Sequence, residues 1–157
     1  MNWKNFSLIV CSIALVIGIG FSAMYLEAQT ISGTRSTGTG SIKKLTFSWT
    51  SSAGGSATQA FTGINGRIVR VVTDPDGTDV PTTLYDITLV DDEGFDVLVT
   101  LGANRSATVT EAIAPGIILT NGASTSVVPQ AIAGTLTLNV TNAGNAKKGV
   151  VAVYFTQ

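Results

Sequence analysis

Hydrophobic and polar residues alternate in short runs along most of the chain after residue 42. Leu45, Phe47 and Trp49 alternate with Thr46 and Ser48, and this period of two is typical of a strand with one buried face. The same alternation, or a run of β-branched residues, predicts strands at 67–73, 83–90, 95–101, 106–113, 116–120, 134–141 and 149–156. No helical period is present after residue 28.

Turn residues separate these predicted strands. The clearest groups are Asp74-Pro75-Asp76-Gly77, Asp91-Asp92-Glu93-Gly94 and Asn142-Ala143-Gly144-Asn145. Strands spaced by roughly 10–15 residues, with turns between them, favour a sandwich over a fold that alternates strands with helices. The pattern therefore predicts an all-β fold, an antiparallel β-sandwich or jelly-roll of about eight strands over residues 42–157.

The N-terminus has a different pattern, with no charged residue from Phe6 to Leu26. As a helix rising ~1.5 Å per residue, residues 6–26 span roughly the thickness of a bilayer core. Lys4 precedes this stretch and Glu27 follows it, which favours a cytoplasmic N-terminus. We expect residues 1–27 to form one hydrophobic anchor helix, with the C-terminal domain outside the cytoplasm.

Five residues of this segment have specific expected roles. Trp3 and Tyr25 lie near its two ends, where aromatic side chains favour the membrane–water interface. Ala14, Gly18 and Ser22 are spaced four apart, and small residues on one helix face allow close packing against another helix. The segment therefore predicts an anchor that also associates with other helices.

Two alternatives remain for the N-terminal segment. A cleaved signal peptide would place its cleavage site near Leu26-Glu27-Ala28, where a large residue occupies a position that favours a small one. A helix buried inside a protein assembly would never meet lipid. The following residues, 28–41, are small, polar and rich in glycine and threonine, and they predict a flexible stalk before the domain.

Charge and composition exclude several functions. Nine basic and ten acidic residues give a net charge of −1, without the basic stripe that nucleic-acid binding requires. The chain has no histidine, the commonest general base and metal ligand. Its one cysteine, Cys11, lies in the hydrophobic segment. We therefore predict that the protein is not an enzyme and needs no organic cofactor.

One loop has the residues of a calcium site. Asp74, Asp76 and Asp79 are closely spaced around Gly77, and calcium takes six to eight oxygen ligands. The glutamate that an EF-hand loop would have at its twelfth position is replaced by Tyr85. The alternative is a turn in which the aspartates accept hydrogen bonds from nearby backbone amides.

A second acidic cluster consists of Asp91, Asp92, Glu93 and Asp96. Paired carboxylates hydrolyse glycosides when they face each other across a substrate. Adjacent residues of a strand point to opposite faces, however, so Asp91 and Asp92 would not converge. The cluster is more typical of a solvated hairpin turn.

Five segments resemble small β-sandwich structural proteins of tailed bacteriophages and prophages, and the similarity covers most of residues 61–157. They are Gly66-Arg67-Ile68-Val69-Arg70-Val71-Val72-Thr73-Asp74-Pro75, Pro81-Thr82-Thr83-Leu84-Tyr85-Asp86-Ile87-Thr88-Leu89, Asp92-Glu93-Gly94-Phe95-Asp96-Val97-Leu98, Ala103-Asn104-Arg105-Ser106 and Gly134-Thr135-Leu136-Thr137-Leu138-Asn139-Val140-Thr141-Asn142-Ala143-Gly144. The resemblance implies a head decoration, tail or fibre-associated component without catalysis. Such proteins usually lack the hydrophobic N-terminal segment found here.

These observations lead to one expected function and one alternative. The expected function is a structural protein of a phage virion, in its capsid or tail, which contacts other virion proteins and forms a homo-oligomer through its β-sandwich and N-terminal helix. The alternative is a bacterial cell-surface or pilus-like module, with a signal peptide or membrane anchor, that binds a glycan or host partner. Gene neighbours would separate the two.

Overall fold

The computed structural model describes residues 28–35, 40–120 and 125–157. These residues form nine strands: β1 Thr30–Arg35, β2 Ile42–Thr50, β3 Ala57–Pro75, β4 Asp86–Val90, β5 Glu111–Ile113, β6 Gly116–Thr120, β7 Thr125–Pro129, β8 Ala131–Thr141 and β9 Lys148–Thr156. All the strand pairs are antiparallel. The predicted all-β, antiparallel class is therefore confirmed.

The predicted anchor helix lies outside the described residues. So do the residues assigned to helix packing and to the membrane interface, namely Ala14, Gly18, Ser22, Trp3 and Tyr25. Within the described part of the chain, no helix has the length and apolar character needed to cross a bilayer. The anchor therefore stays a prediction.

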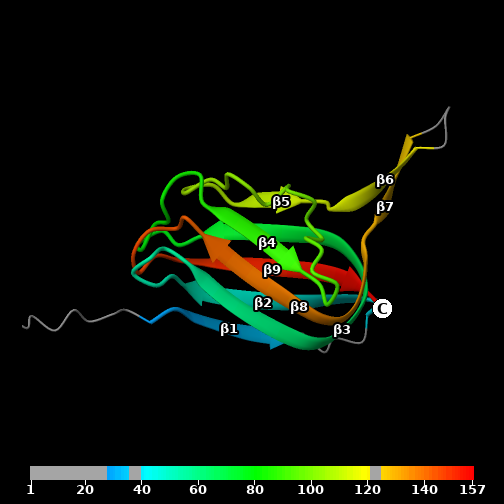
Figure 1. Ribbon diagram of the computed structural model, residues 1–157, viewed down its shortest axis with the longest axis horizontal. Helices are drawn as coiled ribbons and strands as arrows, with labels where there is room; N and C mark the ends of the chain where they lie inside the picture. Colours follow the sequence, from blue (N-terminus) through cyan, green and yellow to red (C-terminus); the bar gives the residue numbers. More distant parts are fainter. Residues whose placement is uncertain (1–27, 36–39, 121–124) are drawn as a thin grey trace, which may run out of the picture.

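Seven strands form one sheet, in the order β1-β2-β9-β3-β8-β4, and β5 pairs with β3 beside this path. The other two strands, β6 and β7, form a separate two-stranded hairpin. Figure 1 shows β4 and β8 lying across β9 and β2, while the hairpin projects from one end of this body.

Strand β3 is the element that folds the sheet over. Its first part, Ala57–Arg67, pairs with β8, and its second part, from Arg67 to Pro75, pairs with β9. The register shifts between Phe61 and Ile64 and again between Ile68 and Arg70. Such irregularities bend a strand and increase its twist, so one strand contributes to both layers.

The core lies between these layers, and the alternation in β2 is the pattern that fills it. Leu45, Phe47 and Trp49 are all buried. The Phe47 ring packs edge-on against the Phe61 ring of β3, with centroids 4.5 Å apart. Burial of one face of each strand is the main force that holds the folded sheet together.

Part of the predicted stalk over residues 28–41, namely Thr30–Arg35, forms strand β1. Thr30–Arg35 pairs with β2 along its whole length, and Ile31 packs against the core. The Arg35 guanidinium donates a hydrogen bond from Nη1 to the Gly63 carbonyl at 3.1 Å. The strand escaped prediction because it is an exposed sheet edge, so only one large apolar residue marks it.

Candidate interaction surface

The loop after β4 is organised by one carboxylate, that of Asp96. Its Oδ1 accepts hydrogen bonds from the backbone N–H groups of Leu89 and Leu98, both at 3.1 Å. Its Oδ2 accepts a third from the N–H of Thr100 at 3.2 Å. Because these donors are held by a side chain, the backbone here does not need a strand partner.

The strand predicted over residues 95–101 is therefore wrong. Only a single bridge joins Val90 to Asp96, and the residues that follow form turns. Val97 and Leu98 are adjacent, and both are fully buried. The loop therefore contributes two consecutive residues to the core without forming a strand.

The same loop presents a strained backbone at Val99 and Thr100. Their φ angles are +51° and +67°, in the left-handed region that β-branched residues rarely adopt. Conformations of this kind cost of order 1–3 kcal/mol and persist only where the surroundings impose them. Here the hydrogen bonds to Asp96 impose the conformation, and Val99 is left 41 % exposed.

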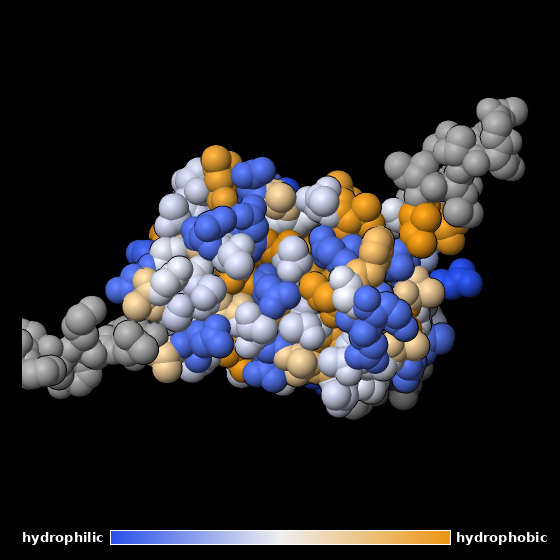
Figure 2. All heavy atoms as spheres, viewed as in Figure 1, coloured by the Kyte–Doolittle hydropathy of each residue, from blue (hydrophilic) through white to orange (hydrophobic). Residues whose placement is uncertain are grey.

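Beside this loop lies an apolar hollow of about 280 Å³. Its lining consists of Phe95, Val99, Leu101, Gly116 and Ile117. The four large side chains among these are each between 41 % and 48 % exposed. Figure 2 shows apolar residues gathered in this region, at the base of the projecting hairpin.

The β6–β7 hairpin starts at the rim of this hollow. Gly116 pairs with Pro129 and Ile117 pairs with Val128, so the base of the hairpin and the lining of the hollow share residues. Beyond this base the hairpin leads away from the sheet (Figure 1). The prediction of a strand at 116–120 is confirmed, and β7 pairs with it in the hairpin.

Replacing Asp96 by alanine is expected to reduce the free energy of unfolding by about 2 kcal/mol, because buried backbone donors lose a charged acceptor. The same variant should expose Val97 and Leu98 and disrupt the hollow. Urea unfolding followed by tryptophan fluorescence measures the loss. Asp92→Ala, which removes the one hydrogen bond that Asp92 Oδ2 accepts from the N–H of Thr135, is the control and should lose less. Equal losses would contradict the role assigned to Asp96.

The loop predicted to bind calcium uses its carboxylates in other ways. Asp76 Oδ1 accepts hydrogen bonds from the N–H groups of Thr78 at 2.8 Å and Asp79 at 2.7 Å. Asp79 forms an ion pair with Lys148 at 2.6 Å, and Asp74 accepts a hydrogen bond from the Thr110 hydroxyl.

The three predicted calcium ligands therefore do not converge. In residues 28–35, 40–120 and 125–157, no group of three or more cysteine, aspartate or glutamate side chains is arranged to hold a metal ion. The turn in which Asp76 accepts backbone hydrogen bonds, the alternative considered from the sequence, is the arrangement found.

The hydrogen bonds in the Asp76 turn predict that the protein loses stability as the pH becomes acidic. Hydrogen bonds from the Asp79 and Thr78 amides, and then the charge of Lys148, lower the pKa of Asp76 below its ordinary value of 3.8. A carboxylate with a lowered pKa stabilises the fold above its unfolded-state pKa, and the effect disappears as pH falls through the folded-state value. We expect the melting temperature of Asp76→Asn to change less with pH than that of the wild type below about pH 4. Thermal melts of both proteins over this pH range measure the difference. An unchanged acid slope would contradict this.

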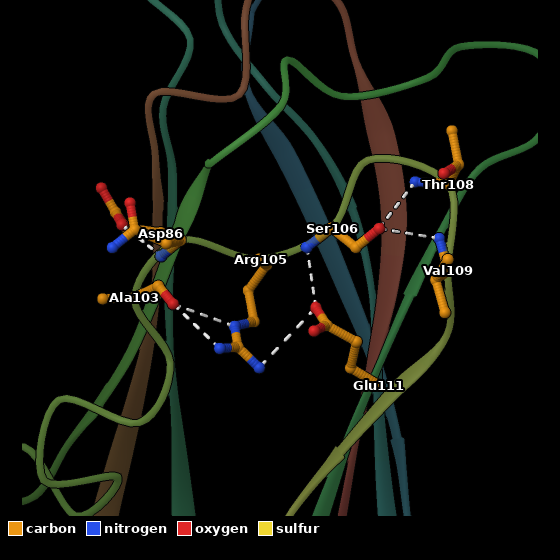
Figure 3. Close-up of polar contacts among 8 residues, drawn as sticks. Asp86, Ala103, Arg105, Ser106, Thr108, Val109 and Glu111 are labelled. Atoms are coloured by element: carbon orange, nitrogen blue, oxygen red, sulfur yellow. Dashed lines mark hydrogen bonds and ion pairs between the residues drawn. The ribbon is translucent and has the colours of Figure 1, made fainter.

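Further polar groups hold the loop between β4 and β5 (Figure 3). Arg105 donates to the Ala103 carbonyl from Nε at 3.2 Å and from Nη2 at 2.9 Å. Its Nη1 lies 3.7 Å from Glu111 Oε2, which also accepts the N–H of Ser106 at 2.7 Å. Asp86 Oδ1 accepts the N–H of Asn104 at 2.9 Å. The charged side chains of Asp86, Arg105 and Glu111 therefore stabilise the conformation of this loop.

The second acidic cluster forms the turn that the sequence predicts. Asp91 Oδ1 accepts hydrogen bonds from the N–H groups of Glu93 at 3.1 Å and Phe95 at 2.8 Å. Asp92 instead contacts the neighbouring strand β8 through the N–H of Thr135, at 3.0 Å. The two adjacent carboxylates therefore bond to different parts of the backbone and do not face each other across a cleft.

A second, more polar hollow of about 480 Å³ lies on the other layer of the sheet. Hydroxyl groups contribute much of its lining, together with Asp74, Asp76 and Lys148. The hydroxyl-bearing residues are Thr30, Ser32, Ser48 and Thr50. Such a surface has the hydrogen-bonding groups of a binding site for a polar ligand, although its charged residues already have the partners described above.

Comparisons with known proteins place the chain in no family. No family model matches it, and no curated protein matches it. One solved structure with similarity is the enzymatically active domain of tailspike protein 4 of bacteriophage CBA120, with 17 % sequence identity and a TM-score of 0.36. The match covers 83 % of this chain, which spans only about a fifth (20 %) of that structure.

Proposed function

We propose that this chain is a non-enzymatic structural protein of a bacteriophage virion, which assembles with copies of itself. The observation that carries the proposal is the apolar hollow at one end of the body, whose large lining residues Phe95, Val99, Leu101 and Ile117 are partly exposed. Exposed apolar patches of this kind mark protein interaction sites.

The use of the charged side chains supports a structural role. Asp76, Asp91 and Asp96 accept backbone hydrogen bonds that shape loops, and Arg105 bridges two segments of one loop. A catalytic acid or base must instead reach a substrate. The chain also has no histidine to activate a hydroxyl nucleophile.

Three of the five segments that resemble phage β-sandwich proteins contribute to strands of the sheet. Residues 66–75 form the second part of β3, residues 81–89 lead into β4, and residues 134–144 form most of β8 and its turn. The all-β antiparallel sheet agrees with the fold class that the resemblance implies. We place the N-terminal hydrophobic segment, 6–26, in a membrane or in the interior of the assembly.

Quantitative mass spectrometry of purified phage particles tests this proposal. Peptides from residues 42–157 should be present in every particle, at a constant copy number relative to the major capsid or tail protein. These peptides should still be detected when the particles are treated with a bacterial protease mixture before purification. A protein that is absent from purified particles and present in the bacterial envelope would overturn the proposal.

The second candidate function is a cell-surface binding module, and the polar hollow favours it. The hydroxyls of Ser32, Ser48 and Thr50 resemble the polar groups that orient a sugar, yet the aromatic platform that often accompanies them is not among the exposed residues of its lining. Envelope location, together with glycan-array binding that Ser48→Ala abolishes, would establish this candidate in place of the first.

A further inference from the structure

The outer face of the layer formed by β2, β9 and β3 carries two cations beside one aromatic ring. Tyr154 of β9 pairs with Lys44 of β2 on one side and with Arg70 of β3 on the other. The Arg70 guanidinium carbon lies 4.3 Å from the centre of the tyrosine ring, and Lys44 Nζ lies 5.7 Å from it. Contacts between a cation and an aromatic ring are attractive, so Tyr154 holds both charges in place at the surface.

A β-bulge in β3 adds a third cation, Arg67, to the same face. Residues three apart in a regular strand point to opposite faces. The register shift between Ile68 and Arg70 inserts one extra residue, which brings Arg67 and Arg70 to one face. Arg67 pairs with Thr156, which pairs in turn with Ile42, a residue that is 58 % exposed. We call the surface formed by Ile42, Lys44, Arg67, Arg70 and Tyr154 the cationic face.

The cationic face points to solvent, away from the second layer of strands. Leu45, Val71 and Phe155, which neighbour its residues along the same strands, are buried, so the face is turned away from β4 and β8 (Figure 1). Carboxylates are concentrated in β4 and in the loop that follows it, namely Asp86, Asp91, Asp92, Glu93 and Asp96. Opposite charges therefore lie on opposite sides of the folded sheet.

The three cations are not neutralised within the domain. In the part of the chain that the structure describes, the ion pairs join Arg105 to Glu111 and Lys148 to Asp79. The next carboxylate along this face of β3 is that of Asp74, four residues or about 13 Å beyond the cluster. The cationic face therefore has the charge to attract an anionic partner.

The chain that precedes β1 brings a lipid surface within reach of this face. The uncharged segment ends at Leu26, and β1 begins at Thr30. These four residue steps span at most about 14 Å, and β1 extends the same sheet beside β2. With residues 6–26 in a bilayer, the sheet is therefore held close to the lipid headgroups.

Other anionic partners fit the cationic face less well. Proteins that bind double-stranded DNA through its backbone make about six to ten phosphate contacts, and three cations are too few for this. A second copy would offer its acidic loop, but Asp91, Asp92 and Asp96 already accept backbone hydrogen bonds. Headgroup phosphates are free to meet all three cations, and exposed aliphatic and aromatic side chains beside them favour the membrane interface.

We propose that the cationic face lies on an anionic lipid surface, as a second membrane contact beside the N-terminal segment. Arg67 and Arg70 donate hydrogen bonds to headgroup phosphates, whose geometry the guanidinium group matches. Ile42 reaches toward the acyl chains, and β4 with its acidic loop is turned away from the lipid. The inference goes beyond the proposed virion role and rests only on the placement of residues 6–26 in a membrane.

Quenching by brominated lipid tests which face meets the membrane. Full-length protein with Cys11→Ser and Ile42→Cys carries a fluorescent probe at position 42. It is reconstituted into vesicles of phosphatidylcholine with brominated acyl chains, with or without phosphatidylglycerol. We expect the probe to be quenched strongly only when phosphatidylglycerol is present. Phe95→Cys, at a residue of the acidic loop that is 46 % exposed, is the control and should not be quenched in either vesicle.

Removing one cation measures the electrostatic contribution. Arg70→Gln should lower the ratio of docked to undocked protein about fivefold, the effect of one basic residue near an anionic membrane. Lys147→Gln removes the same charge just before β9, at the end of that strand away from Tyr154, and should leave the ratio unchanged. Both variants should melt at the wild-type temperature in neutral detergent. Equal losses in the two variants would show that net charge, and not this face, attracts the membrane.

Three other results would overturn the proposal. Quenching at position 95 that equals quenching at position 42 would place the acidic loop and the apolar hollow against the lipid. A change in probe emission at position 42 that depends on protein density, without quenching by brominated lipid, would show that a second copy covers the face. Recovery of the full-length protein apart from the vesicles would remove the membrane on which the inference rests. In each case the virion role stands if peptides from residues 42–157 are found in purified particles.

Discussion

Replacing Gly66 by alanine is expected to reduce the free energy of unfolding by about 3 kcal/mol, as overpacking and backbone strain combine. Gly66 lies next to Arg67, where β3 changes its partner from β8 to β9. Its φ is +144°, and an added Cβ would lie 1.8 Å from the carbonyl oxygen of Thr156. Because the obstacle is backbone, a side-chain rotation cannot relieve the clash.

Gly63→Ala is the matched control for Gly66→Ala. Gly63 lies in the same strand and also has a positive φ, +71°, but no atom lies within 4 Å of the position its Cβ would take. It should therefore lose only the conformational term, about 1 kcal/mol. Urea unfolding at low protein concentration measures both variants. Equal losses would show that the close approach to Thr156 is not what requires glycine at 66.

Replacing Phe47 by alanine is expected to reduce the free energy of unfolding by about 4 kcal/mol, the typical loss for a fully buried aromatic residue. Phe47 is 0 % exposed, and it joins β2 to β3 through its edge-on contact with Phe61. Its removal leaves a cavity between the two layers. Phe61, which is only partly buried, would lose its partner ring as well.

Phe95→Ala is the control for Phe47→Ala. The substitution is the same, but Phe95 is 46 % exposed, and in the dissociated protein it should lose less than about 1 kcal/mol. Thermal and urea unfolding at high dilution keep assembly from contributing. A loss at position 95 that equals the loss at 47 would contradict the placement of the core.

Residue alternation predicted the strands whose faces differ most in environment. Leu136, Leu138 and Val140 are buried in β8, and alternation placed this strand at 134–141, close to its observed bounds of Ala131–Thr141. Strand β9 was likewise placed within one residue. A strand with one face in the core must alternate, so its own residues carry the information.

Strands outside the core were harder to predict. Alternation missed β1 and the first part of β3, where exposed polar residues and glycine interrupt the apolar pattern. These segments are strands because partners distant in sequence accept their hydrogen bonds, β2 for β1 and β8 for β3. Their own side chains do not distinguish them from a linker.

In the candidate surface, too, some features were predictable from the sequence and others depend on contacts between distant residues. Composition predicts no histidine-dependent catalysis, because the chain has no histidine, and no nucleic-acid binding, because its nine basic residues form no basic stripe. The sequence also marked Phe95, Val99 and Leu101 as apolar, but alternation placed them in a strand. Asp96 decides otherwise by accepting the N–H groups of Leu89, Leu98 and Thr100.

The tertiary structure alone brings the hairpin and this loop together. Val99 and Ile117 line one hollow although they belong to different segments. The local sequence pattern of neither segment predicts that the two lie side by side. Local patterns record whether a residue faces the core, since burial selects residue type position by position. A surface assembled from separate loops depends on long-range packing, which leaves no local period in the sequence.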